Sequence, residues 1–160
     1  ANIASVLLDR GDADGAIPLL RSSLELRRAK LPADSSELPG IMGLLGAALT
    51  RQGDAASLAE AEPLLRQALE MRRPQFPAVH WRTGESAGAL GDCLMKQAKF
   101  TEAQPLLLER ADAVMKESTV LPLKRRHAIQ TLIELYDATN QPQEAATWRE
   151  RLAAVETTPP

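Results

Sequence analysis

Apolar residues recur along the chain at spacings of three and four, the period of an α-helix with one buried face. The phrase Ala-x-Pro-Leu-Leu occurs three times, at residues 16–20, 61–65 and 103–107. Leu-Gly pairs at residues 45–46 and 90–91 keep the same register. A pattern that returns after about 42–45 residues predicts stacked helical repeats, each of which buries its apolar face only against its neighbours.

We expect an all-α fold of about eight helices in four antiparallel pairs, arranged as a right-handed α-α superhelix. A single domain over residues 1–156 contains repeats at 1–32, 33–76, 77–120 and 121–156, of which the first is truncated. Residues 157–160 are expected to form a disordered tail. The expected helices lie at residues 1–10, 14–30, 37–52, 58–73, 80–97, 101–117, 123–139 and 141–155.

Local signals support these boundaries. Gly11 and Gly53 follow apolar runs, as glycines that end helices do. Asp14 and Thr101 stand where the second helices of two pairs need N-caps. One repeat is three residues longer than the next, and we expect its extra residues, 55–57 or their neighbours, to lie in a turn.

Gly46 and Gly91 stand in the middle of expected helices, where each costs about 1 kcal/mol relative to alanine. A close approach of two helices compensates for this cost, because the missing side chain lets the second helix of the pair come nearer. We therefore expect these glycines to mark the joints within helix pairs. The residues expected to pack at the joints are Leu45, Gly46, Leu49, Ala61, Leu65, Leu90, Gly91, Leu94, Ala103 and Leu107.

Composition and charge exclude several classes of function. With 44% hydrophobic and 25% charged residues, the chain has an ordinary globular composition. Its net charge of −2 comes from 19 basic and 21 acidic residues scattered in both signs, which disfavours nucleic acid as a partner. No apolar run approaches the roughly 20 residues of a membrane span, so we expect no direct membrane insertion.

The sequence contains no pattern that indicates catalysis. No spacing of His, Cys or carboxylate residues matches a metal site, and no glycine-rich phosphate loop is present. The single Cys93 is expected to be a small core residue. We therefore expect a protein that is not an enzyme, with no catalytic residues, metal or cofactor.

The Leu-Gly pair at residues 45–46, followed by Ala61, Leu65 and Ala68, resembles the tetratricopeptide repeat. The long period and the phrase Leu-Glu-x-Arg-Arg, as at residues 69–73, are similar to its kinesin light chain-like subclass. The resemblance implies a solenoid scaffold that binds a peptide or protein segment in a concave groove lined by the first helix of each pair. The groove residues implied are Thr50, Arg51, Glu85, Asp92, Met95, Lys96, His127, Gln130, Glu134 and Asp137.

These groove residues carry mixed charge, which favours a segment of mixed or somewhat basic charge. A second candidate for docking is the basic stretch Lys124, Arg125 and Arg126. It stands at an expected helix start, where the helix dipole opposes positive charge, so an acidic segment is its expected partner.

His80-Trp81 ahead of the pair at 90–91, together with residues 145–149, is also similar to the C-terminal repeat regions of bacterial serine/threonine protein kinases. This resemblance implies an alternative function, that of a regulatory, sensor or self-association domain of such a kinase. Arg110 and Arg149 depart from the repeat pattern, which has small or apolar residues at those positions.

The residue at position 1 is Ala, not Met, and the first repeat begins inside its first helix. We therefore expect a soluble piece of a larger signalling protein, cytoplasmic or extracytoplasmic, with a membrane anchor elsewhere as one alternative. Homo-association through the repeat ends is a further expectation.

Overall fold

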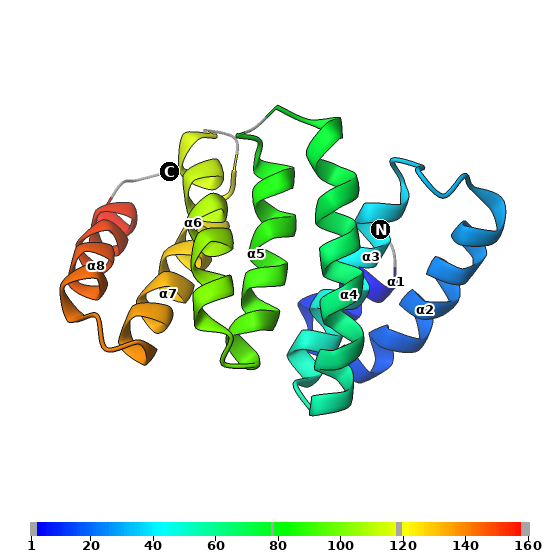
Figure 1. Ribbon diagram of the computed structural model, residues 1–160, viewed down its shortest axis with the longest axis horizontal. Coiled ribbons are helices and arrows are strands. Elements are labelled where there is room, and N and C mark those ends of the chain that lie inside the picture. The colour runs from blue at the N-terminus through cyan, green and yellow to red at the C-terminus, as the bar shows by residue number, and fades with distance from the viewer. Residues whose placement is uncertain (1–2, 78, 118–119, 158–160) are drawn as a thin grey trace. The chain divides into compact units, whose positions relative to one another are not determined.

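The structure is a computed structural model that describes residues 3–77, 79–117 and 120–157. The described residues form eight α-helices and one 3-10 turn, and they contain no β-strand, as the apolar period predicts (Figure 1). The chain divides into two compact units, residues 1–75 and 76–160, and each is described by itself. The prediction of one continuous domain over residues 1–156 stays a prediction.

The first unit consists of two helix pairs. Helices α1 (Ile3–Asp9) and α2 (Ala13–Lys30) form the short opening pair. Helices α3 (Leu38–Gln52) and α4 (Ala55–Arg72) form the second, and a 3-10 turn (Arg73–Gln75) follows α4. Each helix packs on the next one in the chain. Because neighbours in sequence are neighbours in space, the apolar faces are buried locally.

The second unit repeats this plan. Helices α5 (Trp81–Lys96) and α6 (Phe100–Lys116) form one antiparallel pair, and α7 (Pro122–Ala138) and α8 (Pro142–Thr157) form the other (Figure 1). Helix α6 packs on α7, and α5 also contacts α7 directly. Helices α5 and α7 are the first helices of their pairs, so the second unit brings two expected groove helices together. The disordered tail was expected to begin at residue 157, but Thr157 still belongs to α8. Residues 158–160 lie outside the described residues.

All four pairs turn through one residue with a left-handed backbone. The φ angles are 81° at Gly11, 77° at Gly53, 56° at Ala98 and 56° at Asn140. Glycine adopts this conformation without steric cost, whereas alanine does not. The prediction that Gly11 and Gly53 end helices is therefore confirmed, and Ala98 makes the same turn without the residue type that signals it.

Two expected N-caps are wrong. Asp12, not Asp14, caps α2, because its Oδ1 accepts a hydrogen bond from the Gly15 amide at 2.8 Å. Asp14 lies in the first helical turn, where its charge complements the helix dipole. Helix α6 begins one residue before Thr101, which therefore lies inside the helix.

The three extra residues 55–57 do not lie in a turn. Asp54 caps α4 by accepting from the amides of Ala56 and Ser57, both at 3.0 Å, so the helix begins at Ala55. The Ser57 hydroxyl also bonds to this carboxylate and, with the amide bonds, lowers the pKa of Asp54. The extra residues thus lengthen α4 at its start.

The glycines at the two joints have no room for a side chain. A Cβ at Gly46 would lie 2.5 Å from Cγ and Cδ2 of Leu65, and one at Gly91 would lie 2.7 Å from Cδ2 of Leu107. All ten residues expected to pack at the joints are buried. The pairs α3–α4 and α5–α6 therefore pack in the same way, although they belong to different units.

Candidate binding site

The expected groove residues of the first unit are engaged inside it. Thr50, expected at the groove surface, is buried, and its hydroxyl donates to the Gly46 carbonyl at 2.8 Å. Arg51 is exposed, but its Nη1 donates to the Leu8 carbonyl at 2.7 Å and so ties α3 to α1. Of these two residues, only Arg51 presents a side chain to solvent.

The remaining eight expected groove residues lie on the contacting helices α5 and α7. Glu85, Asp92, Met95 and Lys96 belong to α5, and of these only Lys96 is exposed. The four on α7 are all exposed: His127, Gln130, Glu134 and Asp137. We call the surface formed by these eight residues the α5–α7 face.

Three of the four acidic residues on this face are paired with basic residues of the same unit. Glu85 lies 2.7 Å from Nζ of Lys124, on α7. Asp137 lies 2.7 Å from Arg149, on α8. Asp92 lies 2.8 Å from Arg110, on α6. This pairing neutralises most of the negative charge from which a preference for basic segments was expected.

Asp92 is shared between two helices besides its own. Its Oδ2 lies 2.8 Å from Nη1 of Arg110 and 3.5 Å from Nε2 of His127. Burial raises the pKa of the Asp92 carboxyl, but the hydrogen bond to His127 and the attraction of Arg110 outweigh burial and hold this pKa below its usual range. Asp92, an expected groove residue, is therefore the counter-charge of a buried guanidinium.

The basic stretch at the start of α7 has structural partners. Lys124 pairs with Glu85. Arg125 donates from Nη2 to the Glu117 carbonyl at 2.7 Å and from Nε to the Val114 carbonyl at 3.3 Å. It thereby satisfies carbonyls at the end of α6, which have no partner within the helix. Arg126 is exposed and also has a partner, so docking by this stretch stays a proposal.

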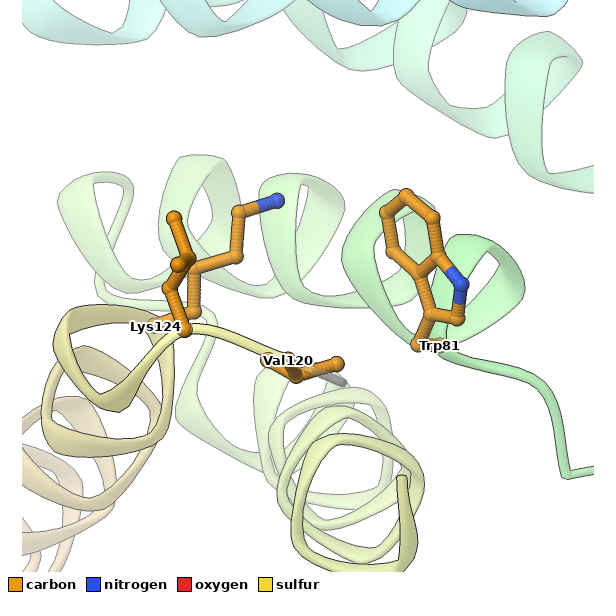
Figure 2. Close-up of a pocket in the computed structure, with 4 residues that line it drawn as sticks. Trp81, Val120 and Lys124 are labelled. Atoms are coloured by element: carbon orange, nitrogen blue, oxygen red, sulfur yellow. The ribbon is translucent and has the colours of Figure 1, made fainter. Parts of the chain in front are cut away.

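A pocket of about 220 Å³ opens between the start of α5 and the connection from α6 to α7. It is lined by Trp81, Val120, Leu121 and Lys124 (Figure 2). Trp81 and Lys124 stand on opposite sides, with Val120 between them. The Lys124 ammonium lies 5.1 Å from the Trp81 ring centroid, within the range of a cation–π contact.

Further aromatic and cationic side chains lie near Trp81, on one wall of the pocket. The rings of Phe76 and His80 stack 4.3 Å apart, and the His80 ring lies 6.0 Å from that of Trp81. The Arg82 guanidinium lies 5.1 Å from the Trp81 ring and 5.6 Å from the Phe76 ring. His80 and Trp81 belong to the motif that resembles the kinase repeat regions, and the sequence alone does not indicate a site at these residues.

Among the described residues, no group of three or more His, Cys, Asp or Glu side chains is placed to hold a metal ion. None of the helices in the described ranges combines the length and the apolar character needed to cross a membrane.

Comparison with known proteins supports the fold. Residues 1–37 match a family model described as a tetratricopeptide repeat. The chain is similar to BtubC (BKLC) from P. vanneervenii, with a TM-score of 0.81 and 18% identity over 99% of this chain and 63% of that one. It is also similar to nearly identical TPR-like repeats of kinesin light chain type from Podosopora anserina, with a TM-score of 0.79 and 20% identity over 98% of this chain and 74% of that one.

A variant of the same Podosopora anserina protein gives a TM-score of 0.78 and 21% identity, over 96% of this chain and 71% of that one. No curated protein matches the chain.

The helix pairs thus define an all-α, tetratricopeptide-type solenoid fold. The Podosopora anserina structures contain kinesin light chain-type repeats, the subclass that the long period predicted. The relation to bacterial kinases stays a prediction.

Proposed function

We propose that this chain is a non-catalytic protein-interaction scaffold that binds an acidic segment of another protein on the α5–α7 face. Stacked helical repeats of this type generally serve as binding surfaces for other proteins. The observation that carries the proposal is the pocket at Trp81, where apolar walls and a cationic rim stand open at the end of that face.

The pocket is large enough for one bulky apolar side chain. Its volume of about 220 Å³ exceeds that of an apolar cavity of ~150 Å³, which accepts a benzene molecule. Leu121, on its wall, is 64% exposed, and the neighbouring Leu123 is 71% exposed. Exposed apolar side chains gathered around a hollow are typical of a surface that a partner covers.

The charge around the pocket favours an acidic partner. Arg82 and Lys124 lie against the Trp81 ring. Among the described residues, Glu85 is the carboxylate that pairs with one of them, Lys124. Further along the face, Lys96 is exposed, whereas Asp92 is held by Arg110. Complementary charge of this kind raises association rates and specificity more than it raises affinity.

The exposed remainder of the face would extend the contact along α5 and α7. Lys96, Gln130 and Glu134 offer polar groups, and the half-buried Met95 offers an adaptable apolar surface. We keep all eight residues of the α5–α7 face in the proposed site, and we place the anchoring contact at Trp81.

The test is calorimetric titration with a short peptide in which glutamates flank a single leucine, and with a control peptide in which lysines replace the glutamates. The first peptide should bind more tightly, and its affinity should fall as salt rises, because the charges are screened. Equal binding of both peptides, or none of the first, would contradict the proposal.

Two exposed leucines give a matched pair of variants. Leu121→Glu places a negative charge on the wall of the pocket, whereas Leu26→Glu places one on α2, in the other unit, at a residue that is 56% exposed. The first change should weaken binding of the glutamate peptide about tenfold or more, from lost apolar contact and repulsion. The second should leave binding unchanged, and equal effects of both changes would place the peptide elsewhere.

A further inference from the structure

Arg110 lies where the repeat pattern has a small residue. It is 3% exposed and follows Leu107 by three positions, as Ala68 follows Leu65 in the preceding pair. Gly88, on α5, provides the space that Arg110 fills. A Cβ at Gly88 would lie 2.1 Å from Cδ of Arg110 and 2.7 Å from its Nε.

The preceding pair has the glycine of this arrangement but not the arginine, because Ala68 stands where Arg110 does. Gly43 stands three residues before Gly46, as Gly88 does before Gly91, but no atom lies within 4 Å of a Cβ built there. Ala68 suffices to pack the joint between α3 and α4, since it is only 1% exposed. Packing alone therefore does not require an arginine at position 110.

The arginine is also costly for stability. Its Nε and Nη2, and Oδ1 of Asp92, are buried and have no hydrogen-bond partner among the described residues. A buried ion pair with unsatisfied groups is weak evidence of stabilisation, because the desolvation of both charges opposes their attraction. The contacts of the Asp92 carboxylate indicate that Arg110 positions helices rather than stabilising the fold.

Two ion-pair contacts join α5 to α7. Near the pocket, Glu85 pairs with Lys124, and two helical turns further along α5, Asp92 meets His127. Arg110 reaches the second contact from α6, so three helices meet at one carboxylate oxygen. Lys124, which lines the pocket, and His127 stand three residues apart on α7 and therefore share one helix face.

We propose that Arg110 is a positioning residue of the α5–α7 face: acting through Asp92, it fixes α7 against α5 and so sets the geometry of the Trp81 pocket. This inference rests on the proposed function for its effect on binding, but not for its effect on His127. Substitutions that act through such a network change binding about two- to thirtyfold.

The test uses the double substitution Arg110→Ala with Gly88→Ala. Removing the arginine frees the space that a methyl group at position 88 needs, and the added alanine restores helix propensity, so this variant should fold. Urea unfolding and circular dichroism establish that it does. Gly43→Ala in the first unit, where space is open, is the matched control.

The first readout needs no ligand. The imidazole nitrogen resonances of His127, followed by NMR against those of His80, report whether the contact with Asp92 persists. In the folded double variant the His127 resonances should move and α7 should exchange its amide hydrogens faster, while His80 and the Gly43→Ala control stay as in the wild type. Unchanged His127 resonances would overturn the positioning role.

The second readout is the affinity for the glutamate-flanked leucine peptide. The double variant should bind it about two- to thirtyfold more weakly than the wild type. Wild-type affinity in the double variant would overturn the inference while leaving the proposed function intact. If the wild type itself fails to bind the peptide, the proposed function fails, and the His127 readout still decides the role of Arg110.

Discussion

Replacing Gly46 by alanine tests whether α3 and α4 pack through a missing side chain. The new Cβ would lie 2.5 Å from Cγ and Cδ2 of Leu65, a residue that is only 1% exposed. Contacts this short cannot persist, so Leu65 or the whole of α4 must move. A buried leucine on a packed helix has little freedom to do so, because protein interiors are close-packed.

The magnitude follows from two opposing terms. Alanine is about 1 kcal/mol better than glycine inside a helix, and overpacking a core costs typically about 1–3 kcal/mol. The net effect of Gly46→Ala is thus a loss of roughly 0–2 kcal/mol. Gly43, three residues earlier on the same helix, has no atom within 4 Å of its built Cβ, so Gly43→Ala should gain up to about 1 kcal/mol.

Urea unfolding followed by far-UV circular dichroism measures both variants against the wild type. The expected order of stability is Gly43→Ala, then wild type, then Gly46→Ala, with the two variants about 1–3 kcal/mol apart. For a chain of this size, each kcal/mol corresponds to about 2–4 °C in Tm. If Gly46→Ala were as stable as Gly43→Ala, the close packing at this joint would be refuted.

Three further predictions concern stability. Asp92→Asn removes the counter-charge of buried Arg110 and should cost about 3–5 kcal/mol in urea unfolding; a loss under 1 kcal/mol would contradict the pairing. Because the folded-state pKa of Asp92 is lowered, its contribution is complete above an unfolded value of about 3.9 and is lost as the pH falls through the lower folded value. A series of urea midpoints against pH should therefore slope less in Asp92→Asn than in the wild type. Ala98→Gly should raise stability by about 1 kcal/mol in thermal unfolding, because φ is 56° there, whereas Gly53→Ala should lower it.

Much of the fold follows from the spacing of apolar residues. The recurrence of Leu-Gly and Ala-x-Pro-Leu-Leu predicted the helix pairs and the glycines at their joints, because one repeat needs the same contacts as the next. The first residues of the helices were harder to predict. Asp12 and Asp14 are both chemically able to cap α2, and only the path of the backbone selects Asp12.

The site could be predicted only in part, because its residues come from distant positions. Trp81 and Lys124 lie on different helix pairs, and the return of the chain through α6 brings them to one pocket. Arg110 looked misplaced in a repeat that has small residues there. On the facing helix α5, Gly88 leaves the space that the Arg110 side chain fills. Gly88 was therefore the signal in the sequence that could have indicated a buried arginine at position 110.

The most direct test of the account is an NMR titration of the protein with the glutamate-flanked leucine peptide, followed at the indole N–H signals. The chain has two tryptophans, and Trp148 lies on α8 beside Arg151, away from the pocket lining. We predict that the Trp81 signal shifts and saturates while the Trp148 signal stays in place. A Trp81 signal that does not move, or equal shifts of both indoles, would contradict binding at the Trp81 pocket.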